Sequence, residues 1–403
     1  MKQELITKRD FIIVSQQAWD VEIGSNCKNI ALEISKHNRV LYVNPPLDRI
    51  TLIRNKHQEK IIKRKKMIHG EEENLIQVSE NVWNLYPDCI IESINWIKSH
   101  FLFDLINTYN NSRYARAILK TAESLGFENV ILFNDNDIFR CFYLKEFLKP
   151  LTSVYYSRDY MVATDYWKYH GEHFEPKLIA KSDICVANSS YLTNYCKTYN
   201  PNSFFVGQGC DTNLFTALNQ LDLPDLEQLP KPLIGYVGAL SSHRLDINLL
   251  AFVATALPAL SIVLIGPEDT EFKESKLHQL KNIHFLGLKE ASVLPNYISA
   301  LDVCINPQIV NEITIGNYPR KIDEYLALGK PVVAVKTEAM EMFKEHTYLA
   351  DNFELFLQHI LQALAENTLE KQQERILFAL SHSWENSVSK IYMAINSFET
   401  VPV

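Results

Sequence analysis

The sequence lacks the cysteine and histidine patterns that build disulfide frameworks or structural zinc sites. Its 403 residues include seven cysteines and 12 histidines, and no two cysteines form a CxxC pair. Disulfide-rich scaffolds and zinc sites bring their ligands at short recurrent spacings, whereas scattered single cysteines are typical of a reducing compartment. We therefore expect a cytoplasmic protein that is held together by hydrophobic cores and carries no structural metal.

The sequence also lacks clear signals for secretion or for crossing a membrane. The first ten residues, MKQELITKRD, contain no apolar core of the kind that signal peptides have. One stretch, Leu249–Gly266, runs for 18 residues without a charge, which is close to the lower limit for a spanning helix. Because Pro258 divides it and its second half, SIVLIG, is rich in β-branched residues, we predict a helix, a turn and a strand instead.

No strong positive balance is present, which argues against broad nucleic-acid binding. The net charge is −8; residues 1–210 carry 26 Lys and Arg against 24 Asp and Glu, and the remainder carries 14 against 24. The densest positive run is Arg54–Lys66. Two interpretations stay open: a solvated helix or loop, or a contact with anionic lipid headgroups at the inner face of the plasma membrane. Acidic Glu71–Glu73 follow directly and would weaken the second.

The sequence instead alternates strands and helices in two halves. Phe11–Ser15 and Arg39–Asn44 read as buried strands with a helix between them, which predicts a parallel βαβ unit. The loop after the first strand has no GxGxxG fingerprint, so a nicotinamide oxidoreductase is disfavoured. We expect two Rossmann-like domains, at 1–210 and 232–382, a proline-rich linker at 211–231 and a terminal helix at about 383–403 that packs back on the first domain.

In the second half, three predicted strands end at glycine. These glycines are Gly238, Gly266 and Gly287. The carboxyl ends of parallel strands lie along one edge of a sheet, and glycine there lets a ligand approach the backbone closely. This edge is therefore a candidate nucleotide site.

The stretch NYPRKIDEYLALGKPVVAV, residues 317–335, predicts a short helix followed by a buried strand. Asn317 is expected to cap the helix, Pro319 to lie in its first turn, and Gly329 to permit a left-handed exit. Arg320 and Lys321 then lie at the positive end of the helix dipole, which is unfavourable by roughly 0.3–1 kcal/mol each. An anion docked at the helix start would remove that conflict.

A nearby carboxylate extends this hypothesis. Glu324 lies one turn after Lys321, so phosphates at Lys321 and ribose hydroxyls at Glu324 would suit a nucleoside diphosphate. The alternative is a surface ion pair between Arg320 and Glu324, with Lys321 solvated.

The first half offers polar groups after two predicted strands. Asn134–Asp137 contains a DxD pattern, which fits either a metal–diphosphate site or, more commonly, capping and turn chemistry. Ser157–Asp159 follows the next strand, at the sheet edge where ligands bind. An aromatic-rich loop then suits stacking on sugar rings as well as ordinary packing; its members are Tyr155, Tyr156, Tyr160, Tyr166, Trp167, Tyr169 and His170.

Several of these motifs together resemble a known family. They are Gly238 after a strand, Gly266-Pro267, FLGL at 285–288, DVCINP at 302–307, YPRKIDEYLALGKPVV at 318–333 and, more weakly, the segment from Ser182 to Asp211. The sequence is similar to retaining glycosyltransferases of the GT-B fold, of the glycosyltransferase family 4 type. Within that type it looks like the cell-surface-polysaccharide branch that includes teichuronic-acid transferases.

The resemblance implies an α/β protein with two doubly wound domains facing across a cleft, an acceptor in the first and a sugar nucleotide in the second. By the same resemblance Arg244 and Lys321 would neutralise the diphosphate, and Glu324 would hold the ribose. The expected donor contacts are Gly238, Arg244, Gly266, Gly287, Leu288, Glu312, Lys321 and Glu324. Asp159 is the candidate for contacting or deprotonating the acceptor.

The expected reaction is transfer of a sugar from a nucleoside diphosphate sugar to a hydroxyl of a glycan or lipid-linked acceptor in surface polysaccharide biosynthesis, with retention and without a metal or other cofactor. Two positions depart from the family pattern. The first glutamate of its Glu-x7-Glu pair is replaced by Gly316, for which Glu312 is expected to substitute, and a frequent arginine after Gly238 is Ala239 here. These departures keep open a sugar-nucleotide-binding protein without turnover.

Overall fold

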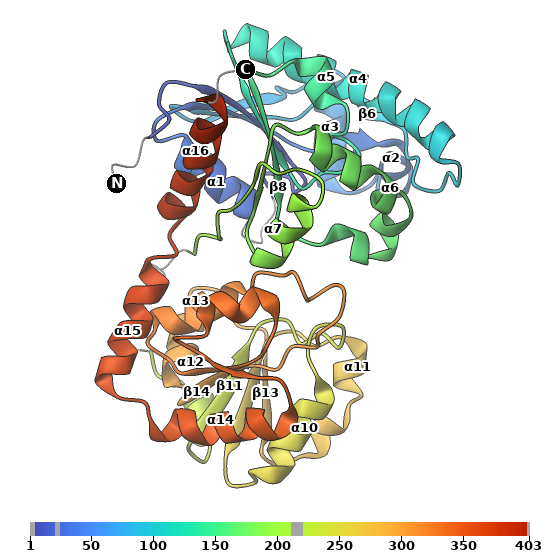
Figure 1. Ribbon diagram of the computed structural model, residues 1–403. Coiled ribbons are helices and arrows are strands. Elements are labelled where there is room, and N and C mark those ends of the chain that lie inside the picture. The colour runs from blue at the N-terminus through green and yellow to red at the C-terminus, as the bar shows by residue number, and fades with distance from the viewer. Residues whose placement is uncertain (1–4, 21–24, 211–220, 401–403) are drawn as a thin grey trace. The chain divides into compact units, whose positions relative to one another are not determined.

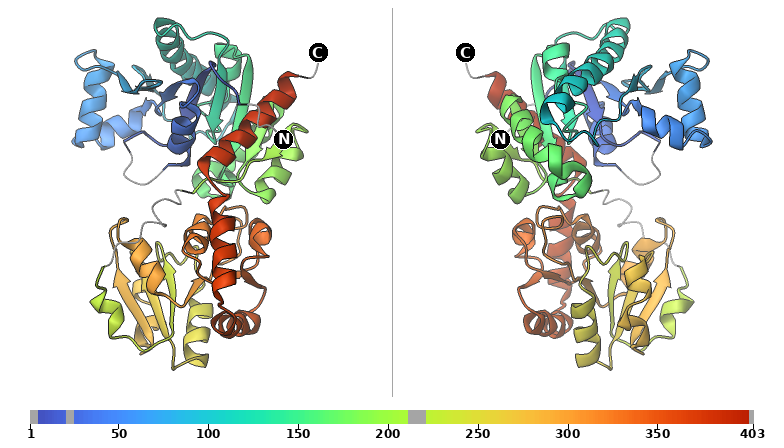
Figure 2. Two further views of the ribbon diagram at one scale, coloured as in Figure 1. Left: turned by 90° about the vertical axis from the view of Figure 1, so that its left-hand side faces the viewer. Right: turned by 90° about the vertical axis from the view of Figure 1, so that its right-hand side faces the viewer.

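Strands and helices alternate along the chain in the computed structural model, which describes residues 5–20, 25–210 and 221–400. They form two units, each with helices on both faces of a mostly parallel sheet (Figure 1, Figure 2). One unit comprises the chain up to Gly207 together with the part from Ser387, and the other comprises Gln208–Asn386. The first part of the predicted linker, 211–220, lies outside the described residues, and its remainder contains the short helix α9 (Pro224–Glu227).

The N-terminal unit is built on an eight-stranded sheet with the order β10-β9-β8-β7-β1-β2-β5-β4. Its strands are β1 (Asp10–Ser15), β2 (Arg39–Val43), β4 (Leu75–Ser79), β5 (Val82–Leu85), β7 (Ile131–Asp135), β8 (Thr152–Ser157), β9 (Ile184–Ala187) and β10 (Ser203–Phe205). Only the β4–β5 pair is antiparallel among these pairings. The predicted βαβ unit is confirmed, because β1 and β2 pair in parallel on either side of α1 (Asn26–Ile34).

The remaining elements of this unit surround the sheet. They are β3 (Leu47–Asp48), β6 (Ile90–Ile91), α2 (Arg49–Arg54), α3 (Glu59–Ile68), α4 (His100–Ser124), α5 (Leu144–Leu148), the 3₁₀ turn η1 (Met161–Ala163), α6 (Asp165–Lys181), α7 (Ser190–Lys197) and α16 (Trp384–Glu399). The last helix, α16, packs on this unit: Asn38 donates to the Tyr392 hydroxyl over 2.9 Å, and Arg9 pairs with Glu399 at 3.1 Å. The prediction of an aromatic-rich loop is wrong at both ends, because Tyr155 and Tyr156 lie in β8 and Tyr166 to His170 lie in the first turns of α6.

The C-terminal unit contains a six-stranded sheet with the order β13-β12-β11-β14-β15-β16. Its elements are β11 (Leu233–Val237), α10 (Ile247–Ala256), β12 (Ser261–Ile265), α11 (Thr270–Lys273), η2 (Lys276–Gln279), β13 (Ile283–Gly287), α12 (Leu294–Ala300), β14 (Val303–Asn306), α13 (Arg320–Ala327), β15 (Val332–Val335), η3 (Glu338–Phe343), β16 (Tyr348–Ala350), α14 (Phe353–Ala365) and α15 (Leu369–Leu380). Numbered within the unit, the order is 3-2-1-4-5-6, that of a doubly wound nucleotide-binding sheet.

Both faces of this second sheet are buried, as the unbroken apolar strands predict. On β11, Ile234 and Tyr236 pack into the core shared with α10 and α14. Leu233 and Val237 point to the opposite core, which contains residues of α12 and α13. The uncharged stretch Leu249–Gly266 resolves into most of α10, a turn and β12, as predicted. Within the described residues, no helix combines the length and hydrophobicity of a membrane span.

The two passages of the chain between the units lie against each other. The Cys210 amide donates to the His382 carbonyl over 2.8 Å. A Cβ atom built on Gly209 would lie 2.3 Å from Cδ2 of Trp384, so only glycine fits there. The Ser387 hydroxyl donates to the Gly207 carbonyl over 3.4 Å. The two passages are therefore paired over several residues.

One buried carboxyl group in α6 has no basic partner. Glu175 is 1% exposed and accepts hydrogen bonds from the Tyr155 hydroxyl at 2.7 Å and the Tyr195 hydroxyl at 3.1 Å. Burial raises its pKa from 4.5 to about 7, although both hydroxyl groups favour the charged form.

The pH dependence of stability tests this assignment. The folded protein keeps the Glu175 proton up to a pKa of about 7, whereas the unfolded chain loses it near the ordinary value of 4.5. Its contribution is therefore fully present below pH 4.5 and disappears as the pH rises to about 7, with a total of roughly 3 kcal/mol. We expect Glu175→Gln to gain stability relative to the native protein over that interval in urea titrations. Glu172→Gln, an exposed change on the same helix, should show no such gain.

Candidate functional site

The carboxyl edge of the C-terminal sheet carries the three predicted glycines. The strand order reverses at β11, which pairs with β12 on one side and β14 on the other. Ligands of doubly wound sheets bind outside the strand ends at such a switch point. Gly238 and Gly266 directly follow β11 and β12, and Gly287 ends β13. The Gly238 amide donates to the Ile265 carbonyl over 2.8 Å and the Gly266 amide donates to the Gly287 carbonyl over 2.9 Å.

Two of these positions accept only glycine. Gly238 has φ +143° and Gly266 has φ +149°, values that residues with a side chain rarely adopt. A Cβ atom on Gly266 would lie 2.0 Å from the Gly238 carbonyl oxygen, and one on Gly238 would lie 2.6 Å from the Lys321 ammonium nitrogen. The edge therefore presents bare backbone, with a cation directly beside it.

Lys321 extends from the first turn of α13 to the end of β11. Its ammonium group contacts the Tyr236 hydroxyl and lies 3.9 Å from the centre of the Tyr236 ring. Lys321 thus contacts Tyr236 and remains partly exposed. Helix α13 is also fixed to β11 by Tyr325, whose hydroxyl accepts from the Val237 amide at 2.9 Å. The sequence reasoning missed Tyr236 and Tyr325, although tyrosines in otherwise aliphatic buried elements are a usable signal, since a buried hydroxyl needs a partner.

The start of α13 differs from the prediction, whereas its end agrees with it. Asn317 does not cap the helix: α13 begins at Arg320, and Pro319 occupies the N-cap position, where it supplies no side-chain acceptor. No side chain caps the first turn, and the Arg320 and Ile322 amides donate to the carbonyls of Tyr318 and Pro319 at 3.0 and 2.8 Å. The positive end of the helix dipole still suits an anion. The predicted exit is confirmed, because Gly329 has φ +70° and the amides of Gly329 and Lys330 close a Schellman motif on Leu326 and Tyr325.

The acidic residues of α13 have separate partners. Glu324 pairs with Arg320, with Oε1 2.9 Å from Nε, which matches the predicted alternative. Burial raises the pKa of the Glu324 carboxyl, and Arg320 opposes that shift. Asp323 is fully buried; Tyr318 donates to it over 2.6 Å, and its other oxygen lies 2.6 Å from Nδ1 of His382. The Glu324 carboxylate is thus occupied by Arg320. Asp323 instead joins α13 to the segment before α16, through His382.

The other predicted donor residues lie on loops of the same edge. Arg244 is exposed and precedes α10. Its guanidinium group has no hydrogen-bond or ion-pair partner among the described residues. Leu288 is 77% exposed, directly after Gly287. Glu312 is exposed in the loop after β14, which is held by contacts between Asn311 and Thr314.

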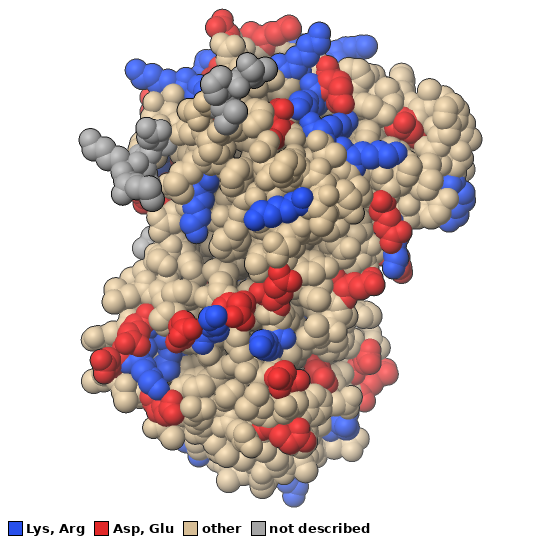
Figure 3. Space-filling model, viewed as in Figure 1, with Lys and Arg blue, Asp and Glu red and all other residues tan. Residues whose placement is uncertain are grey.

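Acidic side chains are spread over the face of the C-terminal unit that Figure 3 shows. They agree with the 24 acidic and 14 basic residues after position 210. Lys321 is therefore a local cation in an acidic unit. Because the unit as a whole repels anions, binding of an anion here would depend on this local group.

The N-terminal sheet has its own switch point, between β1 and β7. There Arg158 pairs with the buried Asp135 at 2.8 Å and with Asp159 at 2.9 Å, and Asn136 accepts from the amides of both Arg158 and Asp159. Asp137 accepts from the Arg140 amide and pairs with its Nε. The two carboxylates of the DxD pattern are therefore engaged by arginines, in agreement with the capping interpretation. The partly exposed Asp159 is the solvent end of this network.

Replacement of Gly266 tests the construction of the C-terminal edge. The clash with the Gly238 carbonyl and the unfavourable φ predict that Gly266→Ala lowers the free energy of unfolding by more than about 3 kcal/mol. Gly70→Ala is the matched control, because Gly70 has φ +75° but no atom within 4 Å of a built Cβ. It should cost about 1 kcal/mol. Equal urea midpoints for the two variants would contradict the described packing.

Comparison with known proteins agrees with this geometry. Residues 231–366 match the family model "Glycosyl transferases group 1". Over 184 residues the chain is 26% identical to the "Putative teichuronic acid biosynthesis glycosyltransferase TuaH" of Bacillus subtilis (strain 168), a match that covers 43% of this chain and 46% of the relative. The chain thus spans about half the length of that relative.

Solved structures show the fold of the whole chain. The sucrose-phosphate synthase of Thermosynechococcus elongatus aligns with a TM-score of 0.65 and 14% identity, over 97% of this chain and 99% of that one. Anabaena HepE in complex with UDP aligns with a TM-score of 0.62 and 14% identity, over 96% and 100%. Residues 231–366 are therefore similar to group 1 glycosyltransferases, in a chain with the GT-B fold.

Proposed function

We propose that the protein transfers a glycosyl group from a nucleoside diphosphate sugar to a hydroxyl of a glycan or lipid-linked acceptor in the synthesis of a surface polysaccharide. The observation that carries this proposal is the position of the Lys321 ammonium group, beside Gly238 and Tyr236 at the uncapped start of α13. A diphosphate at this point would receive a cation, the positive end of a helix and bare backbone together.

The same arrangement suits the chemical step. Departure of a nucleoside diphosphate leaves negative charge on the phosphate oxygens, which a preorganised cation and a helix dipole stabilise. Arg244, exposed and unpaired among the described residues of the same edge, is the proposed second cation. Because these groups supply the positive charge, we propose a reaction without a metal ion, which an assay in the presence of EDTA would test.

Retention at the anomeric carbon is also proposed. No side chain at the edge is an evident nucleophile, so we propose departure and attack on the same face of the sugar, with the product anomer as the readout. Glu324 is the proposed ribose contact, which requires its pair with Arg320 to open or to share an oxygen. Gly287 and Leu288 would face the base. For the base itself, UDP is the first candidate, since HepE was solved with UDP.

The acceptor side is proposed to involve the N-terminal unit. Asp159 is held by Asn136 and paired with Arg158 at the β1–β7 switch point, where a hydroxyl could donate to its exposed carboxylate. Surface polysaccharide synthesis is proposed because the relative TuaH is named for teichuronic acid biosynthesis.

Replacing Lys321 tests the central assignment. We expect Lys321→Ala to lower the transfer rate by about 10²–10³ while the urea midpoint stays near that of the native protein, since only a charge contact at the surface of the edge is lost. Lys344→Ala is the control, because Lys344 is an exposed lysine of the same unit that pairs only with Glu341 among the described residues. Near-normal turnover by Lys321→Ala would refute the role of this residue.

A sugar-nucleotide-binding protein without turnover is the second candidate, favoured by Gly316 and Ala239 at positions where relatives of the resembled family carry charged side chains. Thermal shifts with UDP, GDP, CDP, ADP and dTDP would first identify the base. If the matching nucleotide sugar binds but is neither transferred nor hydrolysed, the binding protein is the correct description.

We also propose a peripheral contact with an anionic membrane through the predicted run Arg54–Lys66. The structure divides this run between the end of α2 and α3, and Arg64 turns inward, where it donates to the Pro45 carbonyl and lies over Tyr86. Lys63 and Lys65 are exposed. Replacing both by Glu should weaken sedimentation with vesicles of anionic lipid and leave binding to neutral vesicles unchanged, because each basic residue contributes about 1 kcal/mol. Equal sedimentation of both proteins would refute the contact.

A further inference from the structure

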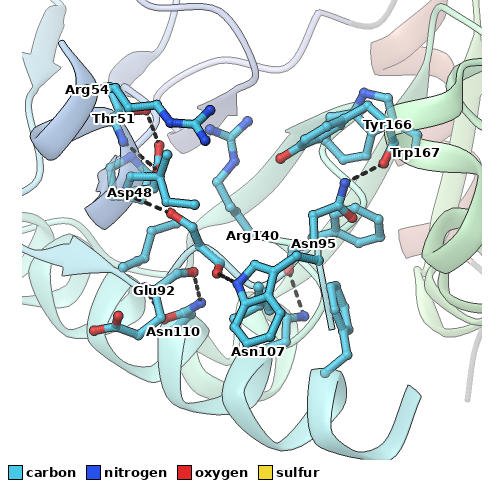
Figure 4. A pocket seen from close by; sticks show the side chains of 18 residues that line it. Asp48, Thr51, Arg54, Glu92, Asn95, Asn107, Asn110, Arg140, Tyr166 and Trp167 are labelled. Carbon is cyan, nitrogen blue, oxygen red and sulfur yellow. Dashed lines mark hydrogen bonds between the residues drawn. The ribbon is translucent and has the colours of Figure 1, made fainter. Parts of the chain in front are cut away.

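One cavity of the N-terminal unit has no role so far. It has a volume of about 570 Å³ and is lined by α2, the segment after β6, α4 and the start of α6 (Figure 4). That volume lies within the range of pockets for small organic ligands. The lining is aromatic on one side, with Trp96, Trp167 and Phe139, and carries charged groups from α2 and from the segment after β7 on the other.

Every carboxylate of the lining is already occupied. Asp48 accepts from the Thr51 amide, the Thr51 hydroxyl and the Ser93 hydroxyl at 3.0, 2.5 and 2.5 Å. Glu92 accepts two hydrogen bonds from Arg49, at 2.6 and 2.5 Å. Neither carboxylate therefore offers a free oxygen to the cavity in the way that an empty cation site would.

The arginines of the lining, in contrast, keep donors to spare. Arg140 uses Nε for its ion pair with Asp137 at 2.5 Å, and its terminal nitrogens have no partner among the described residues. Arg54 has no side-chain partner in that part of the chain at all. In the view of Figure 4 the two guanidinium groups lie beside one another on one side of the cavity. Two like charges converge at a cost unless an anion lies between them, and guanidinium groups bind carboxylate and phosphate in a bidentate manner.

Two aromatic side chains of the cavity lining are exposed to solvent. Trp96 is 70% exposed and Tyr166 is 61% exposed. Their segments are joined, because Asn95 donates to the Tyr166 carbonyl over 2.6 Å, and the Trp96 indole donates to the Ser93 carbonyl over 2.8 Å. Flat apolar rings held in place at a cavity mouth suit the flat faces of sugar rings, whose hydroxyl groups stay in water.

We propose that this cavity binds the acceptor and that the acceptor is an acidic glycan, with a carboxylate or phosphate between Arg54 and Arg140 and a sugar ring against Trp96 and Tyr166. The assignment of the ligand as the acceptor depends on the proposed function, whereas the binding of an acidic sugar does not. The shared chemistry is an anionic group on a hexose, which a uronic acid or a sugar phosphate can supply.

The test measures binding without turnover. Intrinsic tryptophan fluorescence reports on the cavity, because Trp96 and Trp167 line it. Titrations would use methyl glucuronide, glucose 6-phosphate and neutral methyl glucoside. We expect at least one charged probe to bind about tenfold or more tightly than methyl glucoside, since a hydrogen bond to a charged group accounts for such a factor. The tighter of the two charged probes identifies the source of the anion.

The variant is Arg54→Gln, which removes an exposed charge without leaving a buried partner. It should weaken binding of the preferred charged probe about tenfold and leave methyl glucoside unchanged. Lys197→Gln, an exposed change of the same charge on α7, should have no effect on either. Equal binding of charged and neutral probes, absence of saturable binding, or unchanged affinity in Arg54→Gln would each overturn the proposal.

Two further measurements separate this proposal from the donor site. Arg54→Gln should bind UDP as the native protein does, and Lys321→Ala should keep its affinity for the charged sugar while it loses transfer. If Lys321→Ala transfers normally but the charged sugar still binds through Arg54, the proposed function fails and the cavity remains an acidic-sugar site. If Lys321→Ala loses transfer but Arg54→Gln binds the charged sugar normally, the proposed function stands and the assignment of the cavity fails.

Discussion

The contact between Lys321 and the end of β11 determines most of the C-terminal site. A lysine in the first turn of a helix opposes the helix dipole, so an ordinary surface helix gains nothing from it. In this chain the ammonium group instead crosses to Tyr236, where a hydroxyl and a ring face compensate part of the charge. The compensation is incomplete, because neither group is an anion. The helix start and the neighbouring glycines therefore remain complementary to a negatively charged ligand.

The glycines make that contact possible. A side chain at Gly238 would occupy the position of the lysine ammonium group, and a side chain at Gly266 would displace the Gly238 carbonyl. Backbone conformation, cation and helix start are thus mutually dependent: α13 has to approach β11 closely for Tyr325 to bond to Val237, and only bare backbone leaves room for this approach. The closeness that excludes side chains is also what would let phosphate oxygens reach the backbone amides.

Sequence patterns predicted the strands well, because the buried parallel strands are short apolar runs with clear ends. They also placed Gly238, Gly266 and Lys321 in one region, since the carboxyl ends of parallel strands share an edge. They failed where the outcome depends on tertiary contacts. Asn317 is a good capping residue locally, yet the helix begins three residues later, at Arg320. The position of the Lys321 ammonium group depends on Tyr236, which is 85 residues distant in sequence. The cavity between α2, α4 and α6 could not be inferred, because its lining comes from five segments without a shared motif.

The paired passages at Gly209 and Trp384 reach helix α13 through one residue. The backbone carbonyl of His382 accepts from the Cys210 amide, and the His382 ring lies 2.6 Å from the buried Asp323 carboxylate. The segment that follows α15 is therefore linked, by a single histidine, both to the passage at Cys210 and to the helix whose first turn carries Lys321.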